Sequence, residues 1–72
     1  MAKKVFRKTV ATLLTPRPYR EGWTVRVGVG KVGMTKVEIP GRVITVLPDR
    51  VTVIAGGKSI TFQYEAEETV IK

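Results

Sequence analysis

Apolar and polar residues alternate along four stretches of the chain, at residues 23–29, 42–47, 50–55 and 58–64. In an extended chain, successive side chains point to opposite faces, so this period of two places the apolar residues of each stretch on one side. The alternation is typical of half-buried strands and predicts a mostly β structure.

Turn-forming residues separate these stretches. Pro48-Asp49 predicts a type I turn or a slightly longer loop, and Gly56-Gly57 is typical of a two-residue hairpin. A short strand is expected at residues 36–39. The sequence IPGR at residues 39–42 then fits a type II turn, because proline suits its second position and glycine suits its third, where φ is positive.

The two ends of the chain are less regular. Residues 3–14 carry apolar side chains at a helical spacing, but their β-branched residues favour a strand slightly over a helix. Residues 15–22, TPRPYREG, contain two prolines and are expected to form an extended loop. Near the C-terminus, residues 65–68 predict an acidic turn, and residues 70–71 predict a short last strand.

Together these patterns predict an all-β fold, a small closed barrel of five or six strands. The strands follow one another at intervals of about 8–12 residues, and closure would remove the aggregation-prone edges of an open sheet. A chain of 72 residues forms one domain. We expect residues 1–22 to supply a basic N-terminal arm and a proline-rich loop, and residues 23–72 to form the barrel.

Composition excludes several kinds of site. The chain contains neither cysteine nor histidine, so it lacks disulfides, thiolate ligands and the usual general base, and we expect no catalytic residues, metal site or cofactor. No apolar run approaches the roughly 20 residues of a membrane span. We therefore expect a cytoplasmic protein without a membrane partner. A core this small is marginally stable, and a homo-oligomer is one way to stabilise it.

The whole chain has a formal net charge of +7, and the positive charge is concentrated in its first half. Residues 1–36 hold nine lysines and arginines and a single acid, Glu21, whereas residues 37–72 hold four basic and five acidic residues. This asymmetry indicates a polyanionic partner, nucleic acid before a membrane surface. A basic surface that only aids solubility would give the same pattern.

The candidate nucleic-acid-binding residues combine these cations with two aromatic residues. Arginine forks suit phosphates, and exposed aromatic rings stack on unpaired bases. Trp23 begins the alternating apolar face, however, so it is also a candidate for the core. The predicted site consists of Lys3, Lys4, Arg7, Lys8, Arg17, Tyr19, Arg20, Trp23, Arg26, Lys31 and Lys36.

The stretch GVGKVG at residues 28–33 matches the dinucleotide-binding pattern G-x-G-x-x-G. That pattern needs a helix that begins on the glycines, whereas MTKVEIPGRV follows here, with β-branched residues and a Pro-Gly pair. Met34 also occupies the place of the lysine in a P-loop. We interpret the glycines as a strand kink and a loop, from which Lys31 could contact a phosphate.

From Gly22 to Lys72 the chain resembles an SH3-like small barrel. The sequence GWTVRV at residues 22–27 and GRV at residues 41–43 are similar to the KOW-type barrels of ribosomal and transcription-elongation proteins, which open G-x-x-V-x-V and continue G-x-V. Residues 41–71 also resemble bacterial Sm-like proteins, although LPDR stands where the Sm signature has an acidic residue followed by Met-Asn. The resemblance implies a scaffold that binds RNA, DNA or protein segments, and it carries no family binding residue to this chain.

Two functions remain open. The first is a non-enzymatic barrel that binds RNA or DNA phosphates through its basic half. The second is a protein-interaction or assembly module in which an edge strand or the N-terminal arm adds to a partner's sheet. Basic residues that converge on one face would favour nucleic acid, whereas scattered basic residues beside an exposed apolar patch would favour a protein partner.

Overall fold

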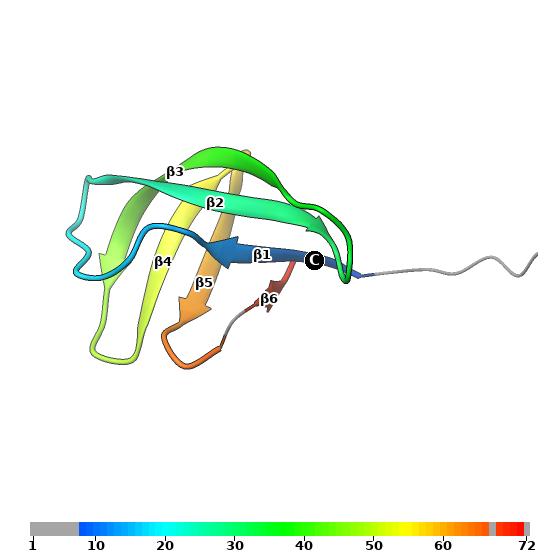
Figure 1. Cartoon of the computed structure of the whole chain (residues 1–72). Helices are drawn as coiled ribbons and strands as arrows, with labels where there is room; N and C mark the ends of the chain where they lie inside the picture. Colours follow the sequence, from blue (N-terminus) through cyan, green and yellow to red (C-terminus); the bar gives the residue numbers. More distant parts are fainter. Residues whose placement is uncertain (1–7, 67, 72) are drawn as a thin grey trace, which may run out of the picture.

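A computed structural model describes residues 8–66 and 68–71, and its secondary structure consists of β-strands (Figure 1). No helix occurs among these described residues, so the expected all-β fold is confirmed. Residues 1–7 of the expected N-terminal arm, with Lys3, Lys4 and Arg7, lie outside the described residues. The strands are β1 (Thr9–Leu13), β2 (Thr24–Lys31), β3 (Val37–Val46), β4 (Arg50–Ala55), β5 (Lys58–Gln63) and β6 (Thr69–Val70).

The strands form one antiparallel sheet in the order β5-β4-β3-β2-β1-β6. Each of the first five strands pairs with its neighbour along the chain, and the last strand returns to pair with β1. The Thr69 hydroxyl donates a hydrogen bond of 3.1 Å to the Thr61 carbonyl, which links β6 to β5. The sheet is thereby nearly closed into a barrel, as an SH3-like barrel fold requires.

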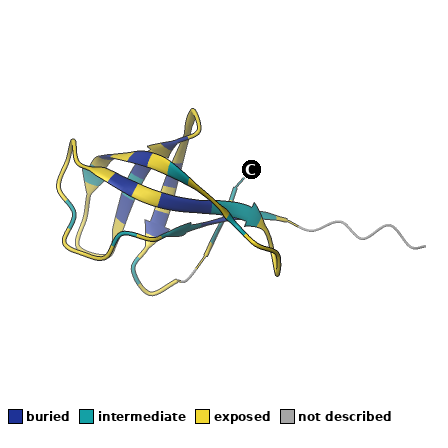
Figure 2. Ribbon diagram, turned by 45° about the horizontal axis from the view of Figure 1, so that its top comes forward, coloured by how far each residue is buried: buried dark blue, intermediate teal, exposed yellow. Residues whose placement is uncertain are grey.

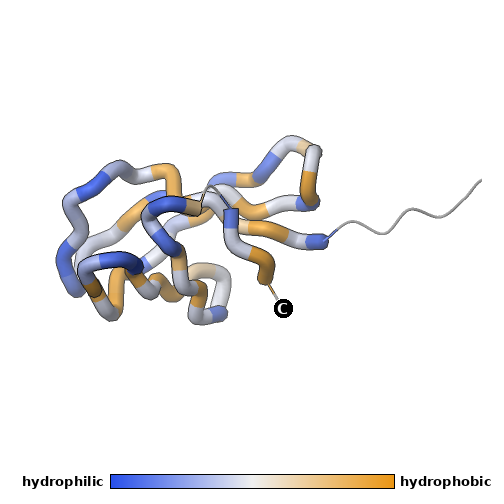
Figure 3. The backbone as a smooth tube through the Cα atoms, turned by 90° about the horizontal axis from the view of Figure 1, so that it is seen from below, coloured by the Kyte–Doolittle hydropathy of each residue, from blue (hydrophilic) through white to orange (hydrophobic). Residues whose placement is uncertain are grey.

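Valine dominates the inward face of this barrel. Val25 and Val27 of β2, and Val51 and Val53 of β4, are at most 2% exposed, and buried and exposed segments alternate along the strands in Figure 2. The hydropathy of the tube alternates similarly (Figure 3). Burial of each such side chain contributes about 1.5–3 kcal/mol, so the period of two decides which face forms the core. The core cluster consists of Ala11, Val25, Val27, Val43, Val51, Val53, Ala55, Ile60 and Phe62.

Both predicted hairpins at the end of the chain are confirmed. Gly56 and Gly57 form the turn between β4 and β5, with φ angles of +59° and +76°. A type I′ turn requires such left-handed angles at both central residues, and glycine adopts them without strain. Pro48 and Asp49 lie in the turn between β3 and β4.

The type II turn expected at residues 39–42 is wrong, because Pro40 and Gly41 lie inside the continuous strand β3. A Cβ at Gly41 would lie 2.5 Å from Cγ1 of Val53, so glycine is needed there for close packing and not for a positive φ. Pro40 pairs with β2, and β3 begins to pair with β4 only at Gly41. The missing N–H of Pro40 therefore removes no bond between β3 and β4.

The strand that was slightly favoured within residues 3–14 is present as β1. It pairs with β2 along its whole length, from Thr9 opposite Lys31 to Leu13 opposite Val27. Residues 9–13 therefore belong to the sheet itself.

The GVGKVG stretch proves to be the end of a strand and a turn. Gly28 and Gly30 lie in β2, and Gly33 adopts a φ of +75° in the loop that follows. A Cβ at Gly30 would lie 3.1 Å from the backbone of Thr35 and of Lys36. Gly30 therefore lets the chain before β3 rest directly on the outer face of β2.

Candidate functional site

The structure places the predicted basic and aromatic residues at opposite ends of the β1–β2 pair. Lys8 and Lys31 lie at one end, where the N–H of Val32 donates to the Lys8 carbonyl at 3.0 Å. The loop with Arg17, Tyr19, Arg20 and Trp23 connects the two strands at the other end (Figure 1). At about 3.3 Å per residue, strands of this length separate the two groups by roughly 15–25 Å.

Two of the remaining predicted cations form ion pairs. Nε of Arg26 lies 3.1 Å from Glu38 on the neighbouring strand, and Nζ of Lys36 lies 2.8 Å from Glu68. Their charges are therefore compensated by acids from the second half of the chain. The described members of the predicted site are thus spread along the length of the β1–β2 pair and do not form one compact cluster.

The two predicted aromatic residues have different surroundings. Trp23 is 49% exposed, so the interpretation of this residue as part of the core is wrong. Trp23 directly precedes β2, at the end of the loop that connects β1 to β2. Tyr19 is half-buried, and its ring stacks on Tyr64 at a centroid distance of 6.1 Å. Tyr19 therefore offers less free ring surface to a base than the sequence suggested.

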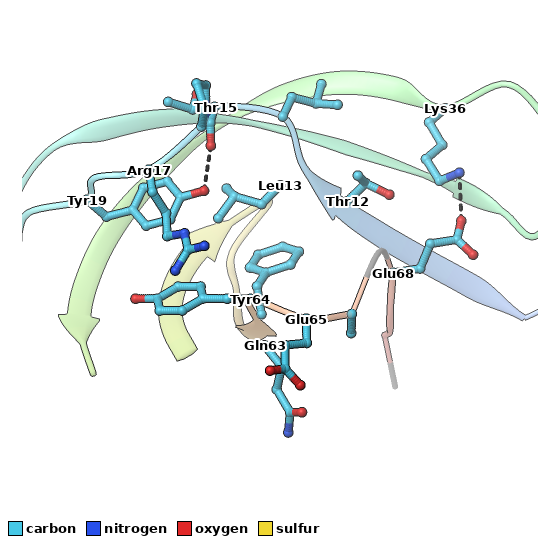
Figure 4. Close-up of a pocket in the computed structure, with 14 residues that line it drawn as sticks. Thr12, Leu13, Thr15, Arg17, Tyr19, Lys36, Gln63, Tyr64, Glu65 and Glu68 are labelled. Carbon is cyan, nitrogen blue, oxygen red and sulfur yellow. Dashed lines mark hydrogen bonds and ion pairs between the residues drawn. The ribbon is translucent and has the colours of Figure 1, made fainter. Parts of the chain in front are cut away.

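An open groove of about 630 Å³ lies beside β1, where the barrel does not close (Figure 4). In the described part of the chain, β6 pairs with β1 only at Val10 and Ala11, so the edge of β1 beyond Ala11 has no strand partner. The groove separates this edge from the end of β5 and the residues after it. Its lining consists of residues 12–17, Tyr19, Lys36, residues 62–66 and Glu68.

The walls of the groove are suited to an extended polypeptide. Leu13 and Phe62 supply apolar surface from the two sides. The N–H of Leu14 donates to Arg26 of β2 at 2.8 Å. Because backbone groups of successive strand residues point to opposite sides, those of Leu13 point away from β2 and toward the groove.

Side-chain contacts bound the groove at its two ends. At one end, Tyr19 stacks on Tyr64, and the guanidinium of Arg17 lies 4.6 Å from the centre of the Tyr64 ring. At the other end, the ion pair between Lys36 and Glu68 lies beside Thr12 (Figure 4). The groove is therefore short and has an aromatic and cationic end.

Two tyrosine hydroxyls fix the aromatic end. Tyr19 donates a hydrogen bond of 2.6 Å to the Thr15 carbonyl, and Tyr64 donates one of 2.8 Å to the Leu47 carbonyl. Burial, with a smaller contribution from Tyr64 and an opposing one from Arg17, raises the pKa of Tyr19 above its ordinary value of 10.0. The Tyr19 hydroxyl thus remains a donor at neutral pH.

Sequence reasoning missed most of this groove. The sequence placed Tyr64 at the end of an alternating stretch and Glu68 in an acidic turn, and neither residue was predicted to belong to a site. The signal that was available is the short last strand, because a strand of two residues cannot cover the whole edge of β1. Arg17, Tyr19 and Lys36 line the groove and were predicted as functional, but for contact with nucleic acid.

Comparisons with models of protein families, with curated proteins and with solved structures found no match for the chain. No helix in the described residues is long and apolar enough to cross a membrane. Within residues 8–66 and 68–71, no group of three acidic side chains is placed to hold a metal ion.

Proposed function

We propose that this protein is a protein-interaction module that accepts an extended segment of a partner in the groove beside β1. The observation that carries the proposal is the edge of β1 beyond Ala11, which has no strand partner among the described residues and faces a groove to which Leu13 and Phe62 contribute apolar surface. An added segment would use the backbone groups of Leu13 for affinity and the groove walls for selectivity.

The distribution of charge and of apolar surface supports a protein partner. Within the predicted site, Lys8 and Lys31 lie at one end of the β1–β2 pair and Arg17 and Arg20 at the other, while Arg26 and Lys36 are ion-paired. Several large apolar side chains are exposed, among them Trp23 at 49% and Leu47 at 42%, both near the end of the barrel that holds Arg17. Exposed aromatic and aliphatic side chains are typical of protein-binding surfaces.

A peptide-binding experiment tests this proposal. We expect a pool of mixed-sequence heptapeptides to bind the protein, and Ala66→Trp, which places a large ring in the groove, to weaken binding roughly tenfold or more. The control is Ser59→Trp, because Ser59 is exposed on β5 and does not line the groove. Equal binding by both variants would show that the groove is not the docking site.

Nucleic-acid binding is a second candidate, favoured by one observation. Lys8 and Lys31 lie at the same end of the β1–β2 pair, and Lys3, Lys4 and Arg7 precede Lys8 in the sequence. Barrels of the KOW and Sm types, which the chain resembles, bind nucleic acids as well as protein segments. This candidate requires only contacts with phosphates at the end of the barrel where β1 begins.

The salt dependence of binding to duplex DNA tests the second candidate. Five phosphate contacts would give a slope of log K against log salt of about −4 to −5, since each neutralised phosphate contributes about −0.9. The double variant Lys8→Gln, Lys31→Gln should make this slope shallower by about two. Arg17→Gln with Arg20→Gln, at the opposite end, is the matched control and should leave it unchanged. Undetectable binding at low salt would exclude this function.

A further inference from the structure

We infer that the groove captures the C-terminal tail of a partner protein, with the terminal carboxylate held by the guanidinium of Arg17. The inference rests on the proposed docking function and specifies which kind of segment docks.

The length of the groove favours the end of a chain over its middle. The last two residues of β1 and the next two residues, Leu14 and Thr15, border the groove and together span about 13 Å of extended chain. The stacked rings of Tyr19 and Tyr64 cross the groove at one end, and the ion pair between Lys36 and Glu68 lies at the other. A segment that continued in both directions would have to pass both of these contacts, whereas a tail that ends at Arg17 passes only the ion pair.

Charge selects the carboxyl terminus over the amino terminus. Four charged residues line the groove, and two of them, Lys36 and Glu68, compensate each other at 2.8 Å. Arg17 has no acidic partner among the described residues, and its guanidinium lies over Tyr64 and points into the groove (Figure 4). A guanidinium stacked in this way keeps the N–H groups at its edge available, and that edge matches a carboxylate bidentately.

The fourth charged residue, Glu65, constrains the residues that precede the terminus. Glu65 is exposed on the rim of the groove, and its side chain points away from Arg17 (Figure 4). Its negative charge would repel acidic side chains upstream in the tail and attract basic ones. The tail that fits best therefore ends in a free carboxylate, places an apolar side chain against Leu13, and carries a neutral or basic residue near Glu65.

The position of Arg17 also fixes the direction of the bound tail. β1 runs toward the loop that holds Arg17, so a tail whose carboxylate reaches this arginine runs parallel to β1. Parallel pairing is slightly weaker per residue than antiparallel pairing. The ionic contact at Arg17 therefore supplies a large part of the affinity for so short a segment.

Paired peptide pools test the inference. One pool of N-acetyl heptapeptides of mixed sequence carries free C-terminal carboxylates, and a second pool of the same composition carries C-terminal carboxamides. We expect the full-length protein to retain the free-acid pool roughly tenfold or more tightly than the amide pool. Arg17→Gln should abolish that preference. Arg20→Gln, an exposed arginine of the same loop that does not line the groove, should keep it.

The outcomes separate this inference from the proposed function. If both pools bind equally and Ala66→Trp weakens both, the groove docks peptides but carboxylate capture is wrong. If Arg17→Gln and Arg20→Gln reduce the preference equally, the preference reflects only the positive charge of the protein, and the inference is overturned. If neither pool binds at millimolar concentration, the docking function itself fails.

Discussion

Glycine has two different structural roles in this barrel, and they depend on what a Cβ would contact. At Gly41, a Cβ would meet Cγ1 of Val53 at 2.5 Å inside the core. At Gly28, the nearest atom would be Cβ of Lys36 at 3.4 Å, which is ordinary van der Waals contact. The first position therefore excludes a side chain, and the second tolerates a small one.

The substitutions Gly41→Ala and Gly28→Ala test this distinction. Gly41→Ala should lower the free energy of unfolding by about 1–3 kcal/mol, because it overpacks a core that cannot relax easily. Gly28→Ala should leave it unchanged or raise it by up to about 1 kcal/mol, since alanine restricts the unfolded chain more than glycine does. Urea unfolding of the two variants measures both effects, and equal losses would contradict the assignment.

The raised pKa of Tyr19 makes one contribution to stability dependent on pH. Because the folded pKa lies above the unfolded value of about 10, the unfolded chain loses this proton first as the pH rises. The contribution is therefore fully present below pH 10 and decreases as the pH rises toward the folded pKa. Tyr19→Phe should remove this component, so the stability of the native protein should fall more steeply above pH 10 than that of the variant. Urea unfolding at several pH values measures this difference. An equal decrease in the free energy of unfolding above pH 10 for the native protein and for Tyr19→Phe would contradict the prediction.

At the scale of elements, β6 is the least supported strand. It pairs with β1 at two positions, and its further connections include the hydrogen bond from Thr69 to Thr61 and the ion pair of the preceding Glu68 with Lys36. The Lys36 and Glu68 side chains are 25% and 38% exposed, so solvent only partly screens the pair. This ion pair connects the loop before β3 to the start of β6 across β1.

Glu68→Gln should therefore loosen β6 locally. We expect faster amide exchange at Ile71, whose N–H donates to the Thr9 carbonyl at 2.9 Å, by an amount equivalent to about 0.2–1 kcal/mol. Glu38→Gln breaks the more exposed ion pair with Arg26 and is the matched control. Exchange at Ile71 that responds equally to both variants would show that the Lys36–Glu68 pair does not hold this strand.

The strands and the glycine hairpin were predictable because their signals are local. Alternation of valines fixes the inward face of β2 and β4, and Gly56-Gly57 fixes the turn between β4 and β5. The sequence IPGR led to the wrong prediction of a turn at residues 39–42. Its local turn preference is overridden because β3 pairs with strands on both sides and packs closely at Gly41. The groove was not predictable because its walls, Leu13 and Phe62, are distant in sequence and its shape depends on how much of β1 is covered by β6.

At the scale of the whole molecule, the two candidate functions lie at different ends of the β1–β2 pair. The groove has its cationic end at Arg17, whereas the basic residues that could contact phosphates lie around Lys8 and Lys31. The roughly 15–25 Å between them exceeds the Debye length of about 8 Å at physiological ionic strength. We therefore expect the two sites to act independently. Self-association of the protein, expected from its small core, stays a prediction.

A competition experiment checks this independence. Addition of a short DNA duplex at a saturating concentration should change the affinity for the free-acid peptide pool by less than about twofold at physiological salt. Displacement of the peptides by the duplex would indicate a single shared site, and it would move the nucleic-acid contacts to the groove.

The central claim is that a partner segment docks on the edge of β1 that has no strand partner among the described residues, and the backbone N–H of Leu13 reports on this edge directly. That group points toward the groove, whereas the N–H of Leu14 is already bonded to Arg26 of β2. The decisive measurement is residue-resolved amide hydrogen exchange with and without the free-acid peptide pool. The account predicts that bound peptide slows exchange at Leu13 at least roughly tenfold and leaves Leu14 unchanged. Peptide binding without added protection at Leu13, or with protection only around Lys8 and Lys31, would contradict it.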